Sequence, residues 1–215
     1  PGPWYVEFSH ADYVVDEGGT STITLVRAAG SSQPLAVYWS VGGTATPGSD
    51  YSGVWENGAA GSRGLVRFGE GETLRTFSIP TIQDYLYEGD ETVLLRLANP
   101  TGGDARGLQD TATLVIRDNE PVPTVRISDA TVTEGNAPTV HIQFSLTATG
   151  KTTLPVSVDW FTADGSATSL NDYFSVLPGT VSFNLAPADP YNPLEVMVID
   201  LETVKVEVKT DVLAE

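Results

Sequence analysis

The residues best suited to chemistry in this chain are carboxylates in its first half, placed just after predicted β-strands. Asp and Glu side chains offer the hard oxygen atoms that divalent cations bind. Two carboxylates about 5 Å apart repel by roughly 3 kcal/mol at an effective dielectric constant near 20, so a crowded group must take up protons, move apart or share a cation. These acidic residues are Glu17, Asp50, Asp84, Glu88, Glu91, Asp118 and Glu120.

A set of short strands must bring these acids together. Consecutive antiparallel strands reverse direction, so the loops after the first, third, fifth and seventh strands reach the same end of the fold. All the acidic residues above lie in or beside those loops, and we therefore expect them to meet at one pole of a β-sandwich. Apolar runs bounded by Gly, Pro, Asn and Ser predict the strands as Trp4 to Val15, Ser21 to Arg27, Leu35 to Val41, Leu65 to Phe68, Leu74 to Ile82, Thr92 to Ala98 and Thr111 to Arg117.

The chemistry of these side chains favours calcium over other cations. Calcium accepts about 6 to 8 oxygen ligands in irregular geometry, whereas magnesium prefers a tighter octahedron and retains its own waters. Zinc favours Cys and His ligands, but the chain has no Cys, and His10 and His141 lie away from the acids in the sequence. The alternative interpretation is that acidic loops only keep the sandwich soluble and prevent pairing of sheet edges.

The overall composition excludes several partners. The 215 residues suffice for one large domain or two of about 100 residues. The net charge of −17 repels nucleic acid and anionic membrane surfaces. No apolar stretch approaches the roughly 20 residues of a membrane span, so we expect no membrane insertion. The absence of Cys excludes disulfides, and a start at Pro1 without Met indicates a piece excised or processed from a longer protein.

Motifs of the first half recur in the same order in the second half, with a spacing of about 120 residues that indicates tandem domains rather than a solenoid. We expect a first domain over residues 1–120, a stiff Pro-rich linker over 121–123, and a second domain over 124–215 that is incomplete at its C-terminal end. The recurring pairs are Glu17-Gly18 with Glu134-Gly135, Asp50-Tyr51 with Asp172-Tyr173, and Asp84 and Glu88 with Asp211 and Glu215.

Tryptophans divide into two classes by their surroundings. Trp39 and Trp160 fall on the third predicted strand of each copy, beside alternating apolar residues, and are typical of core packing. Trp55 lies in a Gly-rich insertion, where it could stack on a sugar of a partner or dock on its own sheet.

These motifs resemble the Calx-beta domain family. The resemblance is carried by Glu17-Gly18, by Gly43-Thr44-Ala45 with Asp50-Tyr51, by Asp84, Glu88 and Glu91, and by Asp118-Asn119-Glu120. It implies an all-β fold of tandem immunoglobulin-like antiparallel β-sandwiches. It also implies that calcium is bound by the acidic residues named above, together with Asn119 and the Leu86 carbonyl, and in the second copy by Glu134, Asp172, Asp211 and Glu215.

The sequence departs from the family pattern at the carboxylates. Gln83 stands where strongly binding relatives tend to have another acid, and Asn119 and Glu120 replace Asp in the terminal triplet. Fewer charges predict fewer or more weakly bound ions.

The resemblance implies a non-catalytic, calcium-binding structural or adhesion module of a larger extracellular or cell-surface protein. The absence of Cys is compatible with a bacterial surface protein. Calcium would stiffen the joint between domains. The expected partners are neighbouring domains of the same parent chain and a cell-surface protein or glycan. The alternatives are a calcium-regulatory sensor module, as in cation exchangers, and a metal-free spacer. We expect no enzymatic activity, because neither His has a nucleophile partner and the carboxylates lie on loop tips rather than in a groove.

Overall fold

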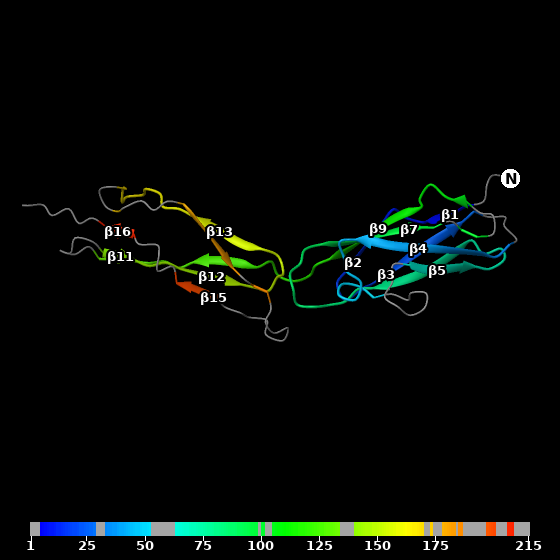
Figure 1. Cartoon of the computed structure of the whole chain (residues 1–215), viewed down its shortest axis with the longest axis horizontal. Helices are drawn as coiled ribbons and strands as arrows, with labels where there is room; N and C mark the ends of the chain where they lie inside the picture. Colours follow the sequence, from blue (N-terminus) through cyan, green and yellow to red (C-terminus); the bar gives the residue numbers. More distant parts are fainter. Residues whose placement is uncertain are drawn as a thin grey trace, which may run out of the picture. The chain divides into compact units, whose positions relative to one another are not determined.

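The computed structural model describes residues 5–28, 33–52, 63–98, 100–101, 105–133, 140–169, 173, 178–183, 185–186, 197–200 and 206–208. The chain divides into two compact units. The first comprises Pro1–Asp84 and Glu88–Asn119, and the second comprises Tyr85–Tyr87 and Glu120–Glu215. All regular elements in the described residues of both units are β-strands (Figure 1). The fold class is therefore all-β, in tandem sandwich domains, as the sequence predicts.

The first unit is a sandwich of two sheets. One sheet has four strands in the order β6-β3-β1-β8, and the other has five in the order β2-β9-β7-β4-β5. The strands are β1 (Tyr5–Phe8), β2 (Asp12–Asp16), β3 (Thr20–Arg27), β4 (Leu35–Gly43), β5 (Arg63–Phe68), β6 (Leu74–Pro80), β7 (Glu91–Leu97), β8 (Ala105–Arg106) and β9 (Thr111–Arg117).

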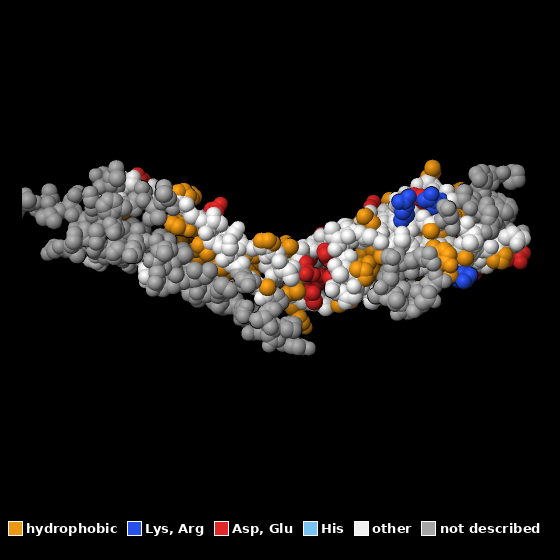
Figure 2. Space-filling view, viewed as in Figure 1, with side chains coloured by type: hydrophobic (Ala, Val, Ile, Leu, Met, Phe, Trp, Pro, Cys, Tyr) orange, Lys and Arg blue, Asp and Glu red, His pale blue; other side chains and the backbone are white. Residues whose placement is uncertain are grey.

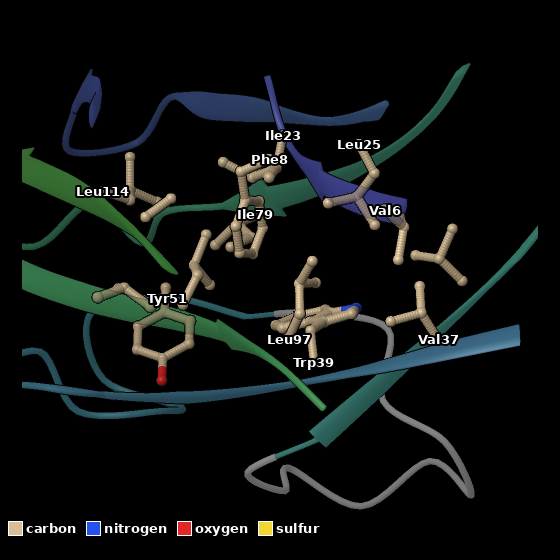
Figure 3. Close-up of a cluster of buried hydrophobic side chains, with 14 of the residues drawn as sticks. Val6, Phe8, Ile23, Leu25, Val37, Trp39, Tyr51, Ile79, Leu97 and Leu114 are labelled. Carbon is tan, nitrogen blue, oxygen red and sulfur yellow. The ribbon is translucent and has the colours of Figure 1, made fainter. Parts of the chain in front are cut away.

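Alternation of side chains along the strands builds the core between these sheets. In β3 the side chains of Ile23 and Leu25 are fully buried, while Thr22 between Ser21 and Ile23 is exposed. β-branched and aliphatic residues suit such half-buried strands. Figure 3 shows the inward side chains of both sheets meeting around Trp39, whose ring stacks on Phe77 at a centroid distance of 4.3 Å. The predicted core role of Trp39 is confirmed.

The single first strand predicted from Trp4 to Val15 is wrong. The structure has two strands here: β1 pairs antiparallel with β3 in one sheet, and β2 pairs parallel with β9 in the other. The chain changes sheets within Ser9–Ala11, so that β1 and β2 each supply apolar side chains to the same core from opposite sides. The antiparallel order assumed for every strand also fails at β8, which pairs parallel with β1. Trp4 lies outside the described residues.

The second unit contains three smaller sheets in its described part, in the orders β10-β12-β15, β11-β16 and β13-β14. Leu146, Ala148, Phe183 and Leu185 form its main buried cluster. Trp160 packs at Tyr173, partly buried. The strands are β10 (Thr124–Ile127), β11 (Val140–Ile142), β12 (Ser145–Thr149), β13 (Val156–Trp160), β14 (Gly179–Phe183), β15 (Met197–Asp200) and β16 (Val206–Val208).

The tripeptide Tyr85–Tyr87 belongs to the second unit by its contacts. The backbone N–H of Tyr87 donates to the Lys151 carbonyl at 2.9 Å, and the Thr152 hydroxyl donates to the Tyr87 carbonyl at 2.5 Å. Thr152 is 2% exposed, so these hydrogen bonds are shielded from water. Tyr87 is therefore held at both its N–H and its carbonyl group.

The described residues contain no helix long and apolar enough to cross a membrane.

Candidate metal site

Three acids of the first unit converge in space. Asp50, Glu88 and Glu91 each offer a carboxylate oxygen, and these oxygens lie within 4.8 Å of one another. Asp50 comes from the connection between β4 and β5, Glu88 from the loop before β7, and Glu91 from the first position of β7. We call this group the Asp50 cluster. Acidic side chains gather toward one end of the first unit in the space-filling view (Figure 2).

A tight turn positions Asp50. Its carboxylate accepts the backbone N–H of Thr46 at 2.5 Å, and its own N–H donates to the Thr46 carbonyl at 3.0 Å. The adjacent Tyr51 is 1% exposed and anchors the turn in the core. As a result Asp50 is only 8% exposed, which places a charge where water solvates it poorly.

Asp118 organises the loop that carries Glu88. The Oδ2 atom of Asp118 accepts the backbone N–H groups of Glu88 at 2.5 Å and Gly89 at 2.6 Å. Gly89 has φ +79°, a left-handed conformation that glycine adopts without steric cost. Because Asp118 follows β9 directly, these bonds fix the start of β7 against the end of β9.

Burial, together with the crowding of charge, raises the pKa of Glu91. Burial is the largest cause, followed by a hydrogen bond from its carboxyl to Asp50 and by repulsion from Asp50, Glu88 and Asp118. Together they raise the pKa of Glu91 from its ordinary value of 4.5 to about 7. Without a cation, this cluster therefore holds a proton near neutral pH, which is one of the three outcomes expected for crowded carboxylates.

Glu17 and Asp84 belong to a second acidic group, separate from the Asp50 cluster. Each offers a carboxylate oxygen, and the two oxygens are within 4.8 Å. The Glu17 N–H donates to the Arg117 carbonyl at 3.1 Å, and the Thr81 hydroxyl donates to the Asp16 carbonyl at 3.0 Å. These bonds tie the turn after β2 to the ends of β6 and β9. The Oε2 atom of Glu17 is buried.

A pair of neutral amides stands beside these acids. Gln83 Nε2 donates to Asn119 Oδ1 at 3.0 Å, and Asn119 Nδ2 donates to Gln83 Oε1 at 3.1 Å. Asn119 Nδ2 also donates to the Glu17 carbonyl at 3.3 Å. The amides thus join two loops directly, at positions where two carboxylates would repel each other unless a cation lay between them. The sequence marked both residues as departures from the family pattern but gave no signal that they pair.

Two further predicted ligands belong to the second unit by their contacts. Leu86 lies in the tripeptide assigned to the second unit, and Glu120 is the residue at which that unit resumes after Asn119. The second-copy candidates Glu134, Asp172, Asp211 and Glu215 all lie outside the described residues, as does Trp55.

One acid of the second unit was missed by the sequence analysis. Asp164 Oδ1 accepts the Tyr173 hydroxyl at 2.5 Å and the Ser169 N–H at 2.7 Å. These hydrogen bonds lower the pKa of Asp164, that of Tyr173 contributing most. Its position just before the repeated Gly165-Ser166-Ala167 motif was the only available signal.

The donor set that the structure assembles consists of carboxylate oxygens. Both acidic groups of the first unit contain Asp and Glu alone, without His. Such oxygen donors, drawn from several loops in irregular arrangement, suit a hard cation of the calcium type. The residues present therefore fit calcium.

Sequence comparison identifies the same domain twice. A model of the Calx-beta domain matches residues 3–120 and again residues 117–210. "Extracellular matrix protein 3" of Lytechinus variegatus is 31% identical over 64% of this chain, and "Adhesion G-protein coupled receptor V1" of Danio rerio is 31% identical over 68%. "Sodium/calcium exchanger Calx" of Drosophila melanogaster is 27% identical over 80% of this chain. The matched regions span only 5%, 2% and 17% of these relatives, respectively.

Solved structures of similar domains were also found. The apo form of the Calx CBD1 domain has a TM-score of 0.48 and 29% identity, covering 55% of this chain and 99% of that one. The tandem CBD12 of CALX1.2 has a TM-score of 0.48 and 23% identity, covering 95% of this chain and 74% of that one.

Proposed function

Because this chain belongs to the Calx-beta domain family, we propose that its first unit binds calcium at the Asp50 cluster and at Glu17 and Asp84. Asp118 would support the first of these sites, and Asn119, Glu120 and the Leu86 carbonyl are proposed as further ligands. Members of this family bind calcium. The observation that carries the proposal is the convergence of Asp50, Glu88 and Glu91 within 4.8 Å.

The electrostatics of the cluster support a cation there. The raised pKa of Glu91 reflects its burial first, and then the hydrogen bond to Asp50 and the repulsion from Asp50, Glu88 and Asp118. A bound divalent cation offsets that repulsion and displaces the proton from Glu91. This stabilisation is largest for a cation that accepts several oxygen ligands at once. Family members are non-catalytic modules, and the proposed role of the site is accordingly structural.

For the whole protein we propose a module of an extracellular or cell-surface protein in which calcium stiffens the joint between consecutive domains. Two observations support this role. The segment Asp118-Asn119-Glu120 runs directly into Pro121, so the strand end that would bind the ion continues into the linker. Two similar proteins carry the names of an extracellular matrix protein and an adhesion receptor.

A regulatory role is the second candidate, supported by the similarity to a sodium/calcium exchanger over 80% of this chain. In such a module calcium binding shifts an equilibrium between flexible and rigid states and so signals to an attached transporter. Affinity separates the two roles, because extracellular modules bind calcium near 10⁻⁴ to 10⁻³ M and sensors near 10⁻⁷ to 10⁻⁵ M.

Calorimetric titration of the chain with calcium tests the proposal, with magnesium as the competing cation. We expect saturable calcium binding that weakens at least tenfold in Asp50→Asn and is retained in Asp12→Asn, an exposed acid on β2 that lies outside the acidic groups. A dissociation constant near millimolar favours the surface module, and one near micromolar favours the sensor. Absence of saturable calcium binding would contradict both roles and leave the metal-free spacer as the remaining interpretation.

A further inference from the structure

A polar cavity lies on the first unit, among residues that take no part in the acidic groups. Its volume is about 350 Å³, and its lining includes Ser40, Arg96, Leu97, Ala98 and Arg106. We call it the arginine cavity. Two of the 11 basic residues of this acidic chain meet here. Basic side chains gather in a patch on the visible face of the first unit (Figure 2).

Strand register places Arg96 on the outer face of the five-stranded sheet. Arg96 pairs with Ser40 of β4 on one side and with Thr111 of β9 on the other. Residues directly opposite each other in antiparallel strands point to the same face. The flanking Leu95 and Leu97 are each 1% exposed and point into the core, whereas Arg96 is exposed. The fold thus presents the guanidinium beside the Ser40 hydroxyl.

The two arginines differ in their partners. Arg106 Nη1 is bound to the Asp110 carboxylate at 2.5 Å. The side chain of Arg96 makes no hydrogen bond or ion pair with any described residue, so its guanidinium donors are open to a ligand. Along β7 it lies five positions after Glu91, roughly 16 Å at about 3.3 Å per residue. That separation exceeds the screening length of about 8 Å at physiological ionic strength, so the Asp50 cluster does not neutralise it.

The chemistry of the cavity selects its ligand. A guanidinium presents a planar pair of N–H donors that matches a carboxylate, and Ser40 adds a hydroxyl that can donate or accept. The volume corresponds to about twelve water molecules at about 30 Å³ each, which exceeds the size of a bare anion. The net charge of −17 disfavours polyanions, and a single open guanidinium matches one carboxylate.

We propose that the arginine cavity binds a small ligand with a single carboxylate, of the size of an amino acid or a monosaccharide, through Arg96 and Ser40. The paired N–H donors of the Arg96 guanidinium would hold the carboxylate, and the body of the ligand would lie over Ala98 and toward Arg106. This site is independent of the proposed calcium site and holds whether or not calcium binds.

Nuclear magnetic resonance of arginine Nε–H groups in the whole chain tests this proposal. Glucuronate and N-acetylglutamate methyl ester are titrated separately at constant ionic strength, with glucose and N-acetylglutamine methyl ester as uncharged counterparts. We expect one arginine signal to shift saturably with at least one carboxylate probe and with neither counterpart. The probe that saturates identifies a sugar acid or an acidic amino acid as the source of the carboxylate.

Matched variants separate a site from general charge attraction. Arg96→Gln should abolish the saturable shift, and Arg96→Lys, which keeps the charge but loses the fork, should weaken binding about tenfold. Arg75→Gln removes the same charge from a residue paired with Glu72 on a different sheet and should leave binding unchanged. Equal weakening in Arg96→Gln and Arg75→Gln, or no saturation with either carboxylate, would overturn the proposal. Circular dichroism verifies that each variant is folded.

Discussion

The Oδ2 atom of Asp118 accepts the backbone N–H of Glu88 at 2.5 Å, so a residue at the end of β9 fixes the loop that brings Glu88 to Asp50 and Glu91. A carboxylate that binds backbone N–H groups is a charge-assisted acceptor, and such bonds are roughly twice as strong as neutral ones. Asp118 therefore has a structural role in the candidate site whether or not it also contacts the ion.

Asp118→Asn should weaken this link. The amide keeps one acceptor oxygen but loses the charge, so we expect the free energy of unfolding to fall by about 1 to 2 kcal/mol and the calcium dissociation constant to rise about tenfold. Urea unfolding and calorimetry measure the two effects. Asp12→Asn, which removes an equal charge from an exposed position, should change neither by more than about 0.5 kcal/mol. Equal effects in both variants would mean that only net charge matters.

Gln83→Glu should strengthen calcium binding. The substitution replaces one half of the Gln83–Asn119 amide pair with a carboxylate beside Asp84, which adds a charged oxygen donor. We expect the calcium affinity to rise by about tenfold, while the calcium-free chain loses stability because the new carboxylate repels its neighbours. Calorimetric titration measures the affinity. Gln143→Glu adds the same charge to an exposed position of the second unit and should leave the affinity unchanged. Weaker calcium binding in Gln83→Glu would show that the neutral amide pair is not what limits the calcium affinity.

The raised pKa of Glu91 predicts a pH dependence of stability. Folding raises this pKa from 4.5 to about 7, so the folded state holds the proton more tightly than the unfolded state. The stabilisation is complete below about pH 4.5 and is lost as the pH rises through about 7. In chelator, urea unfolding at pH 5 to 8 should show this loss, and Glu91→Gln should flatten it. Calcium should bind more tightly at pH 7.5 than at pH 5.5, because it must displace the proton. An affinity that is constant over this range would contradict the assignment of Glu91 to the site.

Because the Trp39 ring lies against Gly64, we expect that any side chain at position 64 destabilises the fold. A Cβ atom on Gly64 would lie 2.4 Å from Cε2 of Trp39, which is buried and stacked on Phe77. Gly64→Ala should therefore lower the free energy of unfolding by about 2 kcal/mol, since neither the ring nor the strand can move easily. Gly42→Ala, on β4 with no atom within 4 Å of the added methyl group, should be nearly neutral. A neutral Gly64→Ala would mean that the core around Trp39 is loosely packed. Gly179 stands in the same relation to Trp160, at 2.7 Å.

Much of the fold could be predicted from the sequence because its signals are local. Alternating apolar residues in β3 and β9 mark strands directly, and the apolar residues beside Trp39 indicate that it lies in the core. The change of sheet within Ser9–Ala11 could not be predicted, since this segment carries no Gly or Pro to mark a break. It depends on which partner strand lies next to each half, and that is decided by tertiary packing.

The residue types of the candidate site could be predicted from the sequence, but the hydrogen bonds that position them could not. Reversal of strand direction sufficed to expect Asp50 near Glu88 and Glu91. The capture of the Glu88 N–H by Asp118, and the pairing of Gln83 with Asn119 across 36 positions of the chain, depend on side-chain geometry that no local pattern encodes. Asp164 was missed for the same reason, because its hydrogen bond to Tyr173 forms only after the loop folds back.

The most direct test of calcium binding to the first unit is differential scanning calorimetry of the chain in calcium and in chelator. A ligand that binds only the folded state at 100 times its dissociation constant stabilises it by about 2.7 kcal/mol. For a domain of about 100 residues this raises the melting temperature by roughly 10 °C or more. We predict such a shift in the wild-type chain and a clearly smaller one in Asp50→Asn combined with Glu91→Gln. Identical melting curves of the wild-type chain in calcium and in chelator would contradict the account.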